Sequence, residues 1–257
     1  MSPLDRYSHS RDAGGKSFAT THWSIVLAAA RPDVHRDRPD AQAALATLCE
    51  TYWYPLYAYV RRLGYKAEDA QDLTQGFFAA LLEKHYVKAA DRRRGRFRSF
   101  LLTALKRFLA KQRDRAHAQK RGGKARPISL DLESGESRYA LEPSHDVTPE
   151  AIYQRRWALT VLDRVIVRLR QVYADAGKDK VFDGVKAFLT GEGGAPPYEQ
   201  VARELGMSQG AVKVAVHRLR RRYRDLLRSE IAQTVADPEA VEEELKDLLA
   251  ALEGGNP

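Results

Sequence analysis

The stretch YEQVARELGMSQGAVKVAVHRLRRRY, residues 198–223, carries the clearest structural pattern in the chain. Its first eight residues have the periodicity of a short amphipathic helix. Gly206 follows, and glycine readily adopts the left-handed backbone conformation that a tight turn requires. Ser208 is a favourable N-cap for a second helix, and its apolar residues form one stripe at helical spacing: Val212, Val216, Leu219, Tyr223 and Leu226. The pattern predicts a helix-turn-helix.

The outward face of the second predicted helix is polar and basic. In a helix-turn-helix, the N-terminal half of this helix contacts base edges in the DNA major groove. Gln and Lys side chains can hydrogen-bond to base edges, and Arg side chains suit phosphates. We therefore expect this face to bind DNA, the alternative being a solvated basic helix without a function. The expected contact residues are Ser208, Gln209, Gly210, Lys213, Val214, His217, Arg218 and Arg221.

Helical periodicity extends over most of the remaining sequence, and no long strand pattern appears. Helices are predicted at 41–63, 67–84, 98–119, 150–174 and 178–189. Gly122, Gly123 and Pro127 open a segment rich in Ser, Glu and Pro, which is typical of a linker. We expect an all-α fold with two helical domains joined by an acidic flexible linker, the second domain containing the helix-turn-helix.

The expected domain limits follow from these helices and breaks. A disordered N-terminus is expected at 1–19, the first helical domain at 20–121, and the linker at 122–149. The helix-turn-helix domain is expected at 150–232, and an acidic C-terminal helix or tail at 233–257. A length of 257 residues suits two domains.

Composition favours a nucleic-acid partner. The chain has 43 Lys and Arg against 34 Asp and Glu, so its net charge is +9, and an excess of positive charge favours polyanions. Two basic blocks, 92–126 with net charge +13 and 211–228 with net charge +6, alternate with acidic blocks at 131–150 (−5) and 229–257 (−7). The expected DNA-reading helix lies in the second basic block.

Several other classes of protein are disfavoured. No apolar stretch reaches the roughly 20 residues of a membrane helix, and the N-terminus has no apolar secretion signal. Cys49 is the single cysteine, so a disulfide framework is excluded and a reducing cytoplasm is expected. We find no metal-ligand spacing, phosphate-binding loop or nucleophile setting, so we expect no catalytic residues, no metal site, no cofactor and no enzyme activity.

Three segments together resemble a known family. They are SQGAVKVAVHRL (208–219), AEDAQDLTQGFF (67–78) and RFRSFLLTALKR (96–107). Their order and spacing are similar to the sigma-70 family of bacterial RNA polymerase sigma factors, of the compact extracytoplasmic-function (ECF) type. The resemblance runs from about Phe18 to Leu252. It implies a protein that binds core RNA polymerase and directs promoter recognition and transcription initiation, with residues 208–219 on the −35 element.

The resemblance assigns partners to two upstream helices. The segment 67–78 resembles the family's docking helix for the clamp of the largest catalytic subunit, which implies contacts by Asp69, Asp72, Gln75 and Phe78. The first three share one helix face, and an acidic face suits a basic groove. The segment 96–107 resembles the −10 recognition helix, which implies roles in −10 binding and melting for Arg96, Phe97, Arg98, Phe100, Lys106, Arg107 and Lys111.

Aromatic rings beside cations can hold unstacked bases, although Phe97, Phe100 and Phe108 also suit a core. The sequence departs from the family at two positions: Phe100 stands where a Trp is frequent, and Arg107 where an Asn is frequent. The preferred −10 sequence therefore stays open.

The main alternative is a stand-alone helix-turn-helix regulator that binds an operator without polymerase. The acidic docking face and the basic aromatic helix of the first domain favour the sigma-factor interpretation. Regulation stays open between an anti-sigma protein, phosphorylation, and an acidic linker and tail that fold over the basic DNA-binding faces. The tail could instead be a helix that packs on the second domain without a regulatory role. Its apolar stripe suits such packing, and consists of Leu245, Leu248, Leu249 and Leu252.

Overall fold

The computed structural model describes residues 39–82, 96–118, 133–140, 147–189, 195–235 and 237–253. Side chains are described from Leu48 onward in the first of these ranges. The expected disordered N-terminus at 1–19 and the segment around Trp23 lie outside the described residues, as do parts of the expected linker.

The fold is all-α, as predicted, and no strand occurs in the described ranges. None of the described helices is both long and apolar enough to cross a membrane. The α-helices are α2 (Pro39–Arg62), α3 (Ala67–Leu82), α4 (Phe97–Ala118), α5 (Glu133–Tyr139), α6 (Pro149–Asp175), α7 (Asp179–Val185), α8 (Tyr198–Leu205), α9 (Gln209–Ala232) and α10 (Val241–Glu253). Two short 3₁₀ helices, η3 (Lys186–Phe188) and η4 (Pro238–Ala240), follow α7 and precede α10.

Helix α2 is the centre of the larger hydrophobic core. Every residue from Thr51 to Val60 is buried, so this part of the helix is enclosed by its neighbours, which include α3, α5 and α6. Gly64, with φ +93°, follows the helix and reverses the chain toward α3. Phe77, Leu81 and several apolar residues of α4 complete this side of the core.

A smaller hydrophobic core lies at the other end of the molecule. It is built from the C-terminal half of α6, together with α7, η3, α8 and α9. Its buried members include Leu169, Phe182, Val201, Val212 and Leu219. The rings of Phe188 and Tyr198 stack with centroids 4.8 Å apart, which ties η3 to the start of α8.

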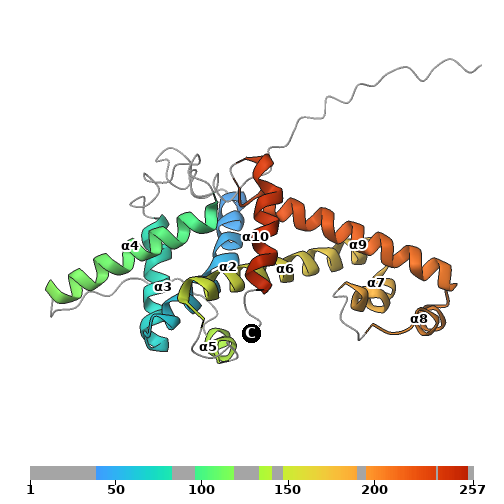
Figure 1. The fold of residues 1–257 in the computed structure, drawn as a ribbon, viewed down its shortest axis with the longest axis horizontal. Coiled ribbons are helices and arrows are strands. Elements are labelled where there is room, and N and C mark those ends of the chain that lie inside the picture. Colours follow the sequence, from blue (N-terminus) through green and yellow to red (C-terminus); the bar gives the residue numbers. More distant parts are fainter. Residues whose placement is uncertain are drawn as a thin grey trace, which may run out of the picture.

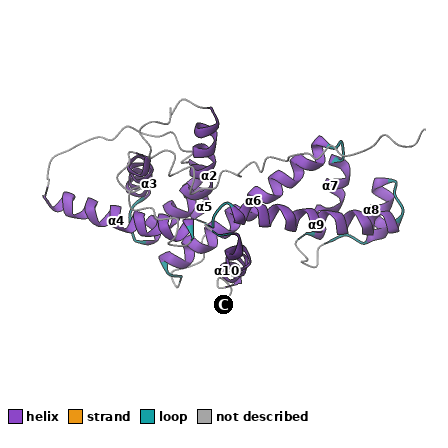
Figure 2. Ribbon diagram, turned by 90° about the horizontal axis from the view of Figure 1, so that it is seen from above, coloured by secondary structure: helices purple, strands orange, loops and turns teal. Residues whose placement is uncertain are grey.

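Helix α6 belongs to both cores. Its first half contributes Tyr153, Trp157 and Val161 to the larger core, and its second half contributes Val165 and Leu169 to the smaller one. Thr148 caps α6 by accepting a hydrogen bond from the Ala151 backbone N–H at 3.2 Å, and Pro149 fits the first turn. Helices α6 and α9 run side by side and connect the two ends of the elongated fold (Figures 1 and 2).

The expected linker contains the short helix α5, which packs against α2. Glu136 of α5 accepts hydrogen bonds from Arg61 at 2.6 and 3.0 Å and from the Tyr57 hydroxyl at 2.6 Å. A Cβ added at Gly135 would lie 3.0 Å from the Trp53 ring, so a larger residue would fit only if the ring moved by a few tenths of an ångström. Residues 133–140 are therefore held against the core.

The C-terminal helix α10 lies beside the starts of α4 and α6 and also packs on α9 (Figure 1). Leu248 is fully buried, and Val241, Leu245 and Leu252 are partly buried against the larger core. Leu249 is 55% exposed and lies at the edge of this apolar stripe, one turn after Leu245. The predicted apolar stripe therefore packs through three of its four leucines.

Candidate nucleic-acid interface

Local geometry explains the turn between α8 and α9. Helix α8 ends at Gly206, which adopts the left-handed conformation with φ 64° and ψ 33°. Helix α9 begins after Ser208, whose side-chain oxygen accepts a hydrogen bond from the Ala211 backbone N–H at 3.1 Å. The predicted roles of Gly206 and Ser208 are confirmed.

The packing of α8 on α9 places one side of α9 inward and the other outward. Ala202 of α8 is buried at the crossing, where a small residue permits close approach. Of the predicted inner stripe, Val212, Val216, Leu219 and Leu226 are buried and Tyr223 is partly buried. The orientation of α9 about its own axis therefore follows the sequence pattern.

All eight residues predicted to contact DNA on α9 and its cap are exposed. No hydrogen bond or ion pair joins the side chains of Gln209, His217 or Arg221 to other described residues. The Lys213 ammonium lies 5.9 Å from the centroid of the Tyr198 ring. Arg220 is different, because its guanidinium donates to the Phe188 carbonyl at 2.9 and 3.1 Å and so holds η3 in place. The exposed face thus presents cations and amide groups that are available to a polyanion.

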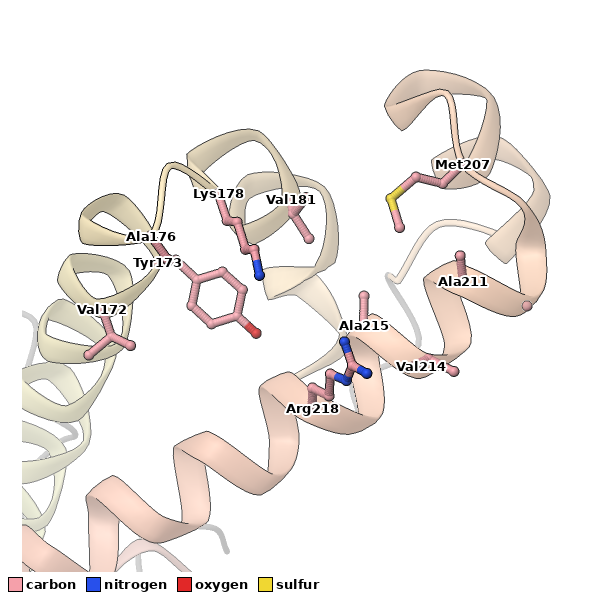
Figure 3. Close-up of a pocket in the computed structure, with 11 residues that line it drawn as sticks. Val172, Tyr173, Ala176, Lys178, Val181, Met207, Ala211, Val214, Ala215 and Arg218 are labelled. Carbon is pink, nitrogen blue, oxygen red and sulfur yellow. The ribbon is translucent and has the colours of Figure 1, made fainter. Parts of the chain in front are cut away.

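A hollow of about 460 Å³ lies beside this face, between α9 and the α6–α7 turn (Figure 3). Most of the residues that line the hollow are apolar. One of them is Val214, which also belongs to the exposed face of α9. Tyr173, Lys178 and Arg218 direct their polar ends toward the space between the helices (Figure 3). Burial raises the pKa of Tyr173, whereas the charges of Arg218 and Arg222 act in the opposite direction. The hollow therefore adds one cation, Lys178, to the exposed face, to which Arg218 already belongs.

Helix α4 has a buried side and a basic side. Leu101, Leu105 and Phe108 are buried against α2 and α3. Lys106, Arg107 and Lys111, predicted to bind nucleic acid, are exposed. Lys106 bonds to Glu150 at 2.7 Å, and this hydrogen bond raises the pKa of Lys106. Arg107 and Lys111 form no ion pair with the described residues, so they are available for phosphates.

The predicted aromatic residues at the start of α4 lie in or against the core. Phe97 is fully buried, and its ring meets the Tyr52 ring at a centroid distance of 5.4 Å. Phe100 is partly buried, with its ring 5.9 Å from that of Phe97. The structure therefore places Phe97 as a core residue, which is the alternative that the sequence left open.

Arg96 and Arg98, at the start of α4, lie beneath α10. Arg98 donates to both carboxylate oxygens of Glu244 at 2.7 and 3.0 Å and to Asp247 at 3.0 Å. Arg96 pairs with Glu244 at 2.8 Å, with Glu243 at 3.1 Å and with Asp247. We call these five residues the α4–α10 charge cluster. Its carboxylates all come from the predicted acidic tail.

The environment keeps Arg98 charged although it is 4% exposed. Burial is the largest single effect and lowers the pKa of Arg98. The hydrogen bond and charge of Glu244, together with the charges of Tyr153 and Asp247, more than offset burial, so the pKa is raised. The guanidinium also lies 4.5 Å from the centroid of the Trp157 ring and donates to Gln154. Tyr153 donates to the Arg98 carbonyl at 2.9 Å, which fixes the backbone.

Helix α3 carries the predicted docking face. Asp69 and Asp72 are exposed, and Gln75 on the same face is partly buried. Phe78 is 1% exposed, and its ring packs 5.8 Å from that of Phe77. The first three predicted residues are therefore on or near the surface, and the fourth is in the core.

The sequence did not identify Glu244 and Asp247 as partners of the start of α4. The local signal was present for Glu244, which lies three residues after Val241 and four before Leu248, within the apolar stripe. A carboxylate at such a position is expected to have a cationic partner. The identity of the partner depends on packing between segments 146 positions apart.

Comparisons of this chain with protein-family models, with curated proteins and with solved structures give no match. The functional interpretation therefore depends on the geometry of these surfaces and on the resemblance carried by the three sequence segments.

Proposed function

We propose that the chain is a sigma factor of the ECF type, which binds core RNA polymerase and directs promoter recognition and transcription initiation. In this proposal α8, the turn and α9 are a helix-turn-helix, and the exposed face of α9 contacts the −35 element. The observation that carries the proposal is the exposure of all eight predicted contact residues on a capped helix, directly after a left-handed glycine.

The exposed basic side of α4 is the second nucleic-acid surface of the proposal. Arg107 and Lys111 lie on the side of α4 away from the core, and Arg113 and Arg115 continue the positive charge toward the helix end. Arg113 donates to the Tyr65 hydroxyl at 3.0 Å while remaining exposed. A surface of this kind suits the phosphates of the promoter near the −10 element.

Two hydrophobic cores support two functional units, one carrying α4 and the other carrying α9. The shared helix α6 connects the two units, because it contributes side chains to both cores. Helix α3 would provide the polymerase-docking face through Asp69, Asp72 and Gln75, because exposed carboxylates complement a basic groove.

The test is co-elution of the purified chain with core RNA polymerase at about 0.15 M salt, where exposed charges beyond about 8 Å are screened. Asp72→Arg reverses a charge on the docking face, and Glu253→Arg makes the same change at the exposed end of α10. We expect the unchanged chain and Glu253→Arg to co-elute with polymerase and Asp72→Arg to elute separately.

A different result would favour the stand-alone regulator. In that case the chain would not bind core polymerase, and the chain alone would bind a specific duplex tightly. Co-elution of all three proteins would instead place the polymerase contact away from α3 and overturn the assigned docking face.

A further inference from the structure

The α4–α10 charge cluster has the chemistry of an occupied anion site. Glu244 presents both carboxylate oxygens to Arg98, and one of them also accepts from Arg96 at 2.8 Å. Asp247 adds a third oxygen that both arginines contact. The guanidinium group of arginine forms paired hydrogen bonds to two phosphate oxygens with the same geometry that it uses for the two oxygens of a carboxylate. The two acids thus stand where a phosphate would bind.

We propose that α10 is a built-in mimic of a nucleic-acid backbone, with Glu244 and Asp247 in a phosphate site formed by Arg96 and Arg98. Helix α10 must undock before these two arginines bind nucleic acid. The inference rests on the proposed function of α4 as a nucleic-acid-binding helix. It concerns the two arginines alone, because the ring of Phe97 packs on Tyr52 in the core.

The surroundings of the cluster favour an anion once α10 is removed. A hollow of about 480 Å³ lies along the joint between α4, α6 and α10. Its lining contains Arg96, Arg98 and Arg155, together with the polar side chains of Ser99 and Gln154. The carboxylate in this lining is Asp247, which α10 supplies. Undocking would therefore leave a basic polar surface continuous with the start of α4.

The attachment of α10 is suited to reversible release. Among its described apolar side chains, Leu248 is fully buried, whereas Val241, Leu245 and Leu252 are partly buried. A buried ion pair contributes little net stability, because desolvation offsets the attraction between the charges. Phosphates can replace the carboxylates without leaving the arginines unpaired. Helix α10 is also the last of the described elements, so its undocking does not pull on a described helix further along the chain.

Single-stranded DNA binding by the full chain tests the inference. The probe is a fluorescein-labelled oligonucleotide of about 12 nucleotides, within the usual site size of single-strand binding surfaces. Glu244→Gln with Asp247→Asn removes the two mimicking charges, and Glu239→Gln with Glu253→Gln removes two exposed charges of the same tail. Fluorescence anisotropy gives the affinities, and hydrogen exchange of residues 241–253 reports whether α10 is docked.

We expect the first pair of substitutions to increase affinity roughly tenfold, which is about 1.4 kcal/mol, and the control pair to change it less than about twofold. Saturating oligonucleotide should also accelerate exchange of 241–253 in the unchanged chain. Equal, measurable affinities for all three proteins, with α10 still protected, would overturn the mimic and leave the proposed function standing. Absence of binding by all three would overturn the mimic and the assignment of α4 as a nucleic-acid-binding helix, whereas the polymerase co-elution tests the proposed function separately.

Discussion

Arg98 and Glu244 form a bidentate ion pair in which the side chains are 5% and 0% exposed, although 146 positions separate them in the sequence. The pair joins the start of α4 to the C-terminal helix. It also explains why two oppositely charged segments of the sequence lie against each other. The start of α4 is therefore covered by the segment that the sequence predicts as an acidic C-terminal helix or tail.

Breaking this pair should destabilise the chain strongly. Glu244→Ala leaves the buried Arg98 without its main partner, and an uncompensated buried charge costs about 3 kcal/mol. Arg98→Met together with Glu244→Leu removes both charges and should come within about 1 kcal/mol of the unchanged chain. Urea unfolding measures each free energy of unfolding.

The exposed pair of Arg228 and Glu242, 2.9 Å apart, provides the matched control between α9 and α10. Its side chains are 60% and 64% exposed, so Glu242→Ala should change the free energy of unfolding by less than about 1 kcal/mol. Similar losses for Glu244→Ala and Glu242→Ala would contradict the importance of the buried pair.

Gly206 and Gly210 should respond to alanine with opposite signs. Gly206 is left-handed, so Gly206→Ala should lower the free energy of unfolding by about 1–2 kcal/mol. Gly210 lies within α9, and a Cβ there would meet only the Ser208 oxygen, at 3.9 Å. Gly210→Ala should therefore raise the free energy of unfolding by up to about 1 kcal/mol. Thermal unfolding of both variants checks the prediction, and stabilisation by Gly206→Ala would contradict the turn geometry.

Removing a cation from the exposed face of α9 should weaken duplex binding and reduce its salt dependence. For Arg221→Ala we expect the slope of log affinity against log salt concentration to become shallower by about one, which corresponds to the loss of one phosphate contact. Lys246→Ala removes an exposed cation from α10 and serves as the control. Titrations with a labelled duplex at several salt concentrations measure the slopes. Equal slopes for both variants would mean that Arg221 does not contact phosphate.

The lone cysteine should be unreactive in the folded chain. Burial, with a smaller contribution from the adjacent Glu50 carboxylate, raises the pKa of Cys49 to about 11. The thiolate is the reactive form, so labelling at about pH 8 should be at least about a hundredfold slower than in urea. A chromogenic thiol reagent measures both rates directly, because Cys49 is the single cysteine. Equal rates would show that the thiol is accessible and ionised in the native state.

The sequence predicts local structure well where the signal lies within one helix or turn. The helix predicted at 150–174 is α6 at Pro149–Asp175, and Gly206 and Ser208 take their predicted roles. These features depend on periodicity, capping and backbone preference, which a short window contains.

Packing between segments that are distant in the sequence could not be predicted from local sequence patterns. The packing of α6 on α2 and of α10 on α4 depends on which apolar faces meet across long connections, which periodicity does not specify. The same limit applies to Phe78 and Phe97, since an aromatic residue at a helix edge can face a partner or the core. Both rings face the core, and their positions alone could not decide this.

Acidification should release α5 from α2 through Glu136. Hydrogen bonds from Arg61, opposed by burial and supported by Tyr57, lower the pKa of the Glu136 carboxyl in the folded state. The folded state therefore favours the carboxylate, and the stabilisation is complete above the unfolded value of about 4.3. It is lost as the pH falls through the lower folded-state pKa.

Glu136→Gln isolates this contribution from the other carboxylates. The difference in free energy of unfolding between the unchanged chain and Glu136→Gln should be positive at pH 7 and should shrink steadily below about pH 4.3. Hydrogen exchange of residues 133–140 should accelerate over the same range in the unchanged chain, and in Glu136→Gln it should already be fast at pH 7. A difference that stays constant from pH 7 to about pH 3 would show that the carboxylate does not hold α5 in place.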